Sequence, residues 1–144
     1  MKRFVFGLES VLRWRRSLFE QQQSRLRALV AERDAIRLRL RELEEWRRRA
    51  ERAVVDAPAV TGGELAALES YRRRLHAERA RKQQELADCE ARIEAQRQRV
   101  VEARRRVRLL ERLKERRYAE WEAEALRELE TLAAESYLAR WKRG

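Results

Sequence analysis

Apolar and small residues in the second half of the chain recur at alternating steps of three and four. The run from residue 64 to residue 143 contains no proline and no glycine. Such spacing predicts one long helix with an apolar seam, and a helix this polar must bury its seam against another helix. The seam positions are Leu65, Leu68, Leu75, Leu86, Cys89, Ile93, Val100, Ala103, Val107 and Leu110.

The first part of the chain carries a matching seam. One heptad phase fits from Val5 onward, with four polar exceptions at Arg15, Gln22, Arg33 and Arg47. A second helix with this seam can supply the partner that the first one needs. The apolar positions of the phase are Val5, Leu8, Leu12, Phe19, Leu26, Leu29, Ile36, Leu40, Leu43, Ala50 and Val54.

The break between the two seams lies at residues 56–63. Pro58 disfavours helical geometry at the residue before it, and Gly62 with Gly63 permits a sharp reversal of the chain. Thr61 followed three residues later by Glu64 predicts a capping box, with Val60 and Leu65 placed as a hydrophobic staple. A break this short predicts antiparallel neighbouring helices.

These patterns predict an all-α fold, a long two-helix antiparallel coiled-coil hairpin with a C-terminal helical overhang. We expect one elongated domain over residues 1–144, with helix one at about 7–55, a turn at 56–63 and helix two at about 64–142. Charged residues make up 42% of the chain, and there are only three Phe and three Tyr, which leaves little material for a compact core.

The hairpin geometry also predicts where helix one runs out. A turn near residue 60 pairs position i with roughly position 120 minus i, so the chain after about Leu113 has no partner from helix one. The apolar stripe changes register there, which indicates a different packing partner or a partly solvated tail. Charged residues take the old seam positions at Lys114, Arg117, Glu124 and Glu128, and the new stripe is Tyr118, Trp121, Ala125, Leu129 and Leu132.

Charge is distributed unevenly along the chain, whose formal net charge is +11. Residues 97–117 include ten basic and three acidic residues, whereas residues 118–138 include one basic and six acidic. Antiparallel pairing places Arg13, Arg15 and Arg16 near Arg104, Arg105, Arg106 and Arg108. Such a surface could follow the phosphates of a nucleic acid or seat an acidic protein, or the arginines could simply serve as helix formers on a solvated face. The absence of any zinc-ligand spacing or helix-turn-helix pattern makes nucleic acid the less favoured partner.

Catalytic chemistry has little support in the sequence. His76 is the one histidine and Cys89 the one cysteine, and Cys89 falls on the seam, where a free thiol acts as a small apolar residue. There is no glycine-rich phosphate loop and no stretch of roughly twenty apolar residues. We therefore expect a non-enzymatic cytoplasmic protein with no cofactor, no metal and no transmembrane segment.

Short motifs occur at the two ends of the sequence. The opening carries Phe6, Leu8, Val11, Leu12 and Arg15. The far end carries Leu113-Lys114-Glu115-Arg116-Arg117, Trp121, Glu130, Glu135 and Arg140. At these positions the sequence resembles the FliJ family of the bacterial flagellar type III export apparatus. One departure is Ala134, where many members have an acidic residue.

The resemblance implies a hairpin similar to the central stalk subunit of rotary ATPases. Its terminal end would insert into the ring of the hexameric flagellar export ATPase, and the hairpin would also contact the export-gate membrane protein and export chaperones. This implies a location at the inner membrane as a peripheral component. The residues expected to bind the ATPase are Leu12, Arg13, Arg15, Arg16, Arg104, Arg105, Arg108, Arg116, Arg117 and Trp121.

The export-gate contact is expected nearer the turn, at Trp46, Tyr71 and Leu75, because antiparallel pairing places Trp46 beside Tyr71. Alternatively, Trp46 only shields a seam weakened by Arg47, Arg72 and Arg79.

Three functional hypotheses remain open: an export component, a basic coiled coil that binds nucleic acid, and a structural coiled coil or the equivalent stalk of a virulence type III secretion system. The turn favours a monomer, although the same heptads could pair two chains.

Overall fold

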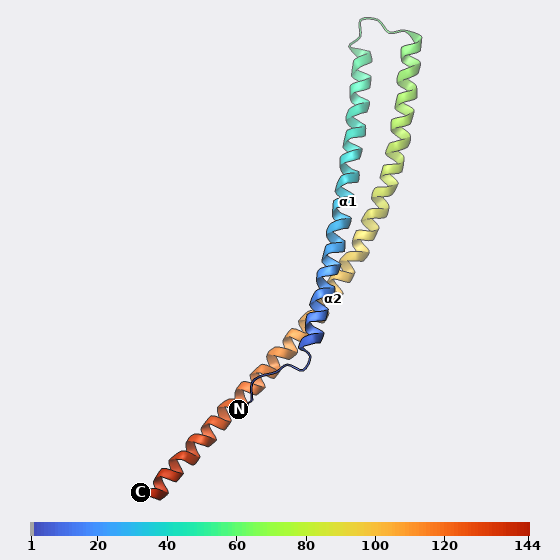
Figure 1. Ribbon diagram of the computed structural model, residues 1–144. Coiled ribbons are helices and arrows are strands. Elements are labelled where there is room, and N and C mark those ends of the chain that lie inside the picture. The colour runs from blue at the N-terminus through green and yellow to red at the C-terminus, as the bar shows by residue number, and fades with distance from the viewer. Residues whose placement is uncertain (1) are drawn as a thin grey trace. The chain divides into compact units, whose positions relative to one another are not determined.

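The computed structural model describes residues 2–144, which fold as two helices with short connecting segments (Figure 1). Helix α1 spans Glu9–Val55 and helix α2 spans Gly62–Arg143, and no strand occurs in this part of the chain. The predicted all-α class with two long helices is confirmed. The predicted helix ends agree with the observed ones to within two residues.

Contacts divide the chain into two compact units. We call Met1–Gln21 with Val101–Gly144 the terminal unit, and Gln22–Val100 the turn unit. Each unit contains part of α1 and part of α2, because the chain reverses direction between the two helices. The single domain expected over residues 1–144 stays a prediction.

In the turn unit the two helices lie side by side and antiparallel (Figure 1). One cluster of buried residues consists of Ile36, Cys89 and Ile93, and Cys89 Sγ lies 3.4 Å from the Leu29 carbonyl oxygen. Burying an aliphatic side chain of this size contributes about 1.5–3 kcal/mol, so these few layers dominate the stability of the unit. The partly buried residues around them are Leu26, Leu29, Val30, Leu40 and Leu86.

One layer of this seam is polar. Gln96 is only 4% exposed, and its amide Nε2 donates to Gln22 Oε1 at 2.7 Å and to the Gln22 carbonyl oxygen at 3.0 Å. The sequence marked Gln22 as an exception to the seam but did not single out its partner. A buried amide must find a hydrogen-bond partner, so this pair fixes the register of the helices where it occurs.

The start of α2 bears out part of the predicted cap. The Glu64 amide donates to Thr61 Oγ1 at 3.1 Å, as expected for a Thr N-cap. The expected seam position at Leu65 is wrong, because this side chain is exposed. Val55 at the end of α1 is exposed as well, so the two helices bury no apolar pair next to the turn.

In the terminal unit the segment before α1 packs along α2 (Figure 1). Phe6, Leu12 and Val107 form its core, with Phe4, Leu8, Phe19, Leu110 and Leu113 packed around them. The Phe4 ring meets the Tyr118 ring edge-on, with centroids 5.2 Å apart, and the Trp121 ring at 5.9 Å. Trp121 Nε1 also donates to the Lys2 carbonyl oxygen at 3.0 Å.

One prediction for this unit is wrong: Val5 does not belong to the seam, because it is 79% exposed. The segment before Glu9 is not helical, and in an extended chain alternate side chains point to opposite sides, so Phe4 and Phe6 face α2 while Val5 faces solvent. After about Leu113 the partner of α2 changes, as the shift of its apolar stripe indicates: the N-terminal segment, and not helix one, covers Tyr118 and Trp121. The uncovered part of α2 begins after Trp121.

We predict that Gln96→Leu lowers the free energy of unfolding by about 1 kcal/mol, because the Gln22 side chain loses its buried partner. The double variant Gln22→Leu/Gln96→Leu should recover this loss, since both polar groups are then replaced by apolar ones. Urea unfolding followed by circular dichroism measures both values. Equal destabilisation of the single and double variants would contradict a role for the amide pair.

Candidate partner-binding surfaces

An arginine-lined groove runs along α2 in the terminal unit. It has a volume of about 370 Å³ and is lined by Val101, Arg104, Arg105, Arg108, Leu109 and Arg112. Val101 and Leu109 are exposed. Arg105 NH1 lies 3.2 Å from Glu102 Oε2, whereas Arg104, Arg108 and Arg112 have no carboxylate partner among the described residues. The groove thus offers free guanidinium groups beside two exposed aliphatic side chains, and three of the arginines predicted to bind the ATPase line it.

The predicted residues on α1 have different surroundings. Arg13 is exposed, and the Arg15 guanidinium lies 4.7 Å from the centre of the exposed Trp14 ring. Arg16 NH2 donates to Glu111 Oε1 at 3.2 Å, so part of its charge is neutralised within the chain. Leu12 is 0% exposed and belongs to the core. It has no surface to offer a partner, which corrects its prediction as a contact residue.

The remaining predicted ATPase contacts lie farther along α2. Arg116 is exposed, and the Arg117 guanidinium lies 5.8 Å from the centre of the Phe6 ring. Trp121 is half-buried under the N-terminal segment. Arg117 and Trp121 therefore hold the terminal unit together as well as bordering its surface.

One ion pair fastens the start of α1 to α2. Lys114 Nζ lies 2.8 Å from Glu9 Oε2. Hydrogen bonding from Lys114 lowers the pKa of Glu9, and the nearby charges of Lys114, Arg16 and Arg13 act in the same direction, against a smaller opposing effect of desolvation. Glu9 thus stays ionised and keeps the cationic Lys114 in place.

In the turn unit the three predicted gate residues line one groove of about 380 Å³, together with Arg74, Ala77, Glu78 and Arg81. Trp46 and Tyr71 are half-buried, and Leu75 is 6% exposed and forms part of the floor. The Arg39 guanidinium lies 4.6 Å from the Trp46 ring centre, and its NH2 is 2.8 Å from Glu78 Oε1. Arg39 donates hydrogen bonds to the Glu78 carboxylate, which raises the pKa of Arg39. The Trp46 ring thus packs against Arg39 and stays partly exposed in the groove.

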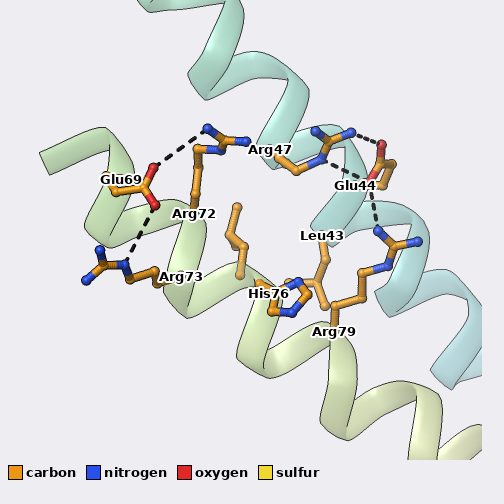
Figure 2. A pocket seen from close by; sticks show the side chains of 9 residues that line it. Leu43, Glu44, Arg47, Glu69, Arg72, Arg73, His76 and Arg79 are labelled. Carbon is orange, nitrogen blue, oxygen red and sulfur yellow. Dashed lines mark hydrogen bonds and ion pairs between the residues drawn. The ribbon is translucent and has the colours of Figure 1, made fainter. Parts of the chain in front are cut away.

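A second cavity in the turn unit, of about 580 Å³, contains the arginines that interrupt the seam (Figure 2). Arg72 Nε lies 3.1 Å from Glu51 Oε1, and Arg79 NH1 lies 3.6 Å from Glu44 Oε2. A hydrogen bond from Arg47 lowers the pKa of Glu44. The residues that line this cavity are Leu43, Glu44, Arg47, Glu69, Arg72, Arg73, Leu75, His76 and Arg79.

This network joins α1 to α2 through carboxylates that the sequence analysis did not single out. Glu44 and Glu51 lie three residues before and four residues after Arg47, which is the spacing that brings side chains together on a helix. The spacing of Glu44 and Glu51 from Arg47 in the sequence therefore could have predicted these ion pairs. His76 is exposed at the edge of the cavity, as expected of a surface residue.

No group of His, Cys, Asp and Glu able to hold a metal ion occurs among residues 2–144. Within the same range, neither helix has a stretch apolar enough to cross a membrane.

The family of the chain follows from its sequence along nearly its whole length. The family model described as Flagellar FliJ protein matches residues 4–131. The chain belongs to the FliJ family. No curated protein and no solved structure matches it. The family-model match confirms the predicted resemblance. FliJ proteins are non-catalytic components of the flagellar export apparatus.

The structure explains why the opening residues identify a FliJ protein. Phe6 and Leu12 are buried in the terminal core and Leu8 packs against them. Packing therefore sets these three motif positions, whereas Val11 is exposed and Arg15 is only partly buried. The FliJ match includes both grooves described above, while residues 132–144 lie beyond it.

We predict that Lys114→Met returns the pKa of Glu9 toward the ordinary carboxyl value, because the neutral side chain no longer favours the charged form. The lowered pKa of Glu9 stabilises the folded state above the ordinary carboxyl pKa, and this contribution is lost as pH falls through the folded-state value. Carboxyl-carbon NMR titration measures it, with Glu85, which pairs with Lys82, as an internal control. An unchanged Glu9 pKa would exclude Lys114 as the cause.

Proposed function

We propose that this FliJ-family chain binds the hexameric flagellar export ATPase through its terminal unit, inserts into the ring, and promotes its assembly and activity. The observation that carries the proposal is the arginine-lined groove of α2, whose Arg104, Arg108 and Arg112 find no carboxylate within the described chain. Guanidinium groups left free on a folded surface are suited to an acidic protein surface.

The charge around the groove supports an acidic partner. Residues 101–117 include eight basic and three acidic residues. Such a surface attracts and orients a partner of opposite charge during association, and it contributes to specificity more than to bare affinity. The acidic partner in this proposal is the inner surface of the ATPase ring.

Aromatic side chains supply the apolar part of the contact. Trp14 is exposed beside Arg13 and Arg15, and Trp121 borders the same unit. Trp and Arg are the residue types that most often carry the binding energy of an interface. Trp14 takes the role that the sequence analysis gave to Leu12, since Leu12 is buried.

A second part of the proposal concerns the turn unit. Trp46 and Tyr71, over the floor formed by Leu75, bind the cytoplasmic part of the export-gate membrane protein. Export chaperones also bind this chain. The chain would then be cytoplasmic and peripherally associated with the inner membrane at the export apparatus. The groove around Trp46 supports this because Trp46 and Tyr71 are both partly exposed there and Arg39 packs on the Trp46 ring.

We expect Arg13→Glu/Arg104→Glu to reduce stimulation of the purified export ATPase by roughly tenfold, since both substitutions replace attraction by repulsion. Neither arginine makes an ion pair within the described chain, so the helical content should not change. ATP hydrolysis and ring assembly are followed while the protein is titrated in. The matched control is Arg25→Glu/Arg41→Glu, which alters two exposed arginines of the turn unit. Equal stimulation by both double variants would remove the terminal groove from the mechanism.

Trp46→Ala should weaken binding to the purified cytoplasmic domain of the export gate by roughly tenfold or more, the effect typical of an aromatic hot spot. Titration calorimetry measures the affinity. Trp14→Ala is the matched control because it removes an exposed tryptophan from the other unit. Loss of gate binding in the control and not in Trp46→Ala would place the gate contact outside the turn unit.

A further inference from the structure

The end of α2 presents an uncovered helix. We call residues 122–143 the overhang, because the N-terminal segment covers α2 only as far as Trp121. Tyr137 is 70% exposed, and several other large apolar side chains of the overhang are exposed too. Apolar side chains at this density on one helix favour a packing partner. The others are Leu126, Leu129, Leu132, Leu138 and Trp141.

Two neighbouring stretches of α2 carry opposite net charge. Residues 118–138 include six acidic residues and one basic, and none of these glutamates forms an ion pair among residues 2–144. The preceding residues 101–117 include eight basic and three acidic residues, with Arg108 and Arg116 also without an ion pair in that range. An acidic stretch and a basic stretch of similar net charge thus follow each other on one helix. Within residues 2–144 the six glutamates form no ion pair, and of the eight basic residues only Arg105, Arg106 and Lys114 do.

We propose that two copies of this chain associate through α2 in antiparallel orientation, so that the overhang of each molecule lies along the arginine-lined groove of the other. Reversing the direction of one helix brings each acidic surface onto a basic one, and the symmetry makes both contacts equivalent. A parallel arrangement would place like charges together. The favoured occupant of the groove in the free protein is therefore a second copy.

The exposed face of α2 selects a register for this pair. Exposed residues recur at steps of three and four on the side of the helix away from Val107 and Trp121. A two-fold axis at Ala119 brings Arg108 of one molecule to Glu130 of the other, and Val101 to Tyr137. Ala119 itself is small, so the helices can approach closely there. The face consists of Val101, Arg105, Arg108, Arg112, Arg116, Ala119, Leu126, Glu130 and Tyr137.

This contact leaves the seam between α1 and α2 intact. The expectation of a monomer rested on the turn, which closes the hairpin but does not occupy the outer face of α2. The inference does not depend on the proposed function. It has a consequence for it, because the pair would cover Arg105 and Arg108, so ATPase binding and self-association would compete.

Charge reversal tests the pairing in the purified full chain by sedimentation equilibrium. Glu130→Arg should raise the dimer dissociation constant roughly tenfold or more, because it meets Arg108 of the other copy. Arg108→Glu/Glu130→Arg should restore dimerisation, since the attraction returns with its direction exchanged. Glu20→Arg, on an exposed glutamate of α1, is the matched control and should dimerise as the unchanged protein does. A monomeric unchanged protein, or a double variant no better than Glu130→Arg, would overturn the proposal.

Cysteine cross-linking tests orientation and register. Under mild oxidation Ala119→Cys should form a disulfide-linked dimer, because the two copies of this residue meet at the axis. Ala134→Cys lies on the same exposed face but opposite Arg104 of the other copy, so it should stay unlinked; in a parallel pair it would link. The unchanged protein controls for Cys89, which is buried. Cross-linking of Ala134→Cys, or none at Ala119→Cys, would overturn the antiparallel arrangement.

Discussion

Burial of apolar side chains between α1 and α2 is the interaction on which this structure depends. Few side chains are fully buried: Leu12 and Val107 lie between the helices of the terminal unit, with Phe6 added from the segment before α1, and Ile36, Cys89 and Ile93 lie between the helices of the turn unit. Exposed ion pairs each contribute little. The seam therefore fixes the register, and every surface outside it is free to serve another purpose.

The polar residues inside the seam specify the arrangement more than they stabilise it. Gln22 and Gln96 satisfy each other in only one register. Arg47 and Arg72 would weaken the seam near the turn, but Glu51 accepts from Arg47 and pairs with Arg72 on the opposite helix. Carboxylates on neighbouring turns thus convert unfavourable seam residues into connections between the helices.

A FliJ protein on this plan separates residues that fold it from residues that can bind partners. Phe6, Leu8 and Leu12 of the opening motif pack in the terminal core, while the guanidinium groups of Arg104 and Arg108 face solvent. The same helix then carries an acidic stretch with exposed apolar residues. This one helix thus carries both surfaces that we propose to bind, one an acidic partner protein and the other a second copy, and the two proposed contacts use overlapping arginines.

The sequence by itself determined the helices, the turn, the Thr61 cap and the family, because heptad spacing, proline, glycine and short motifs act locally. Only the tertiary structure decided which seam residues are buried. Val5 faces solvent since its segment is extended, Leu12 is in the core and unavailable to partners, and Phe4 covers Trp121 from far away in the sequence. These outcomes depend on contacts between distant segments, which periodicity along one helix does not encode.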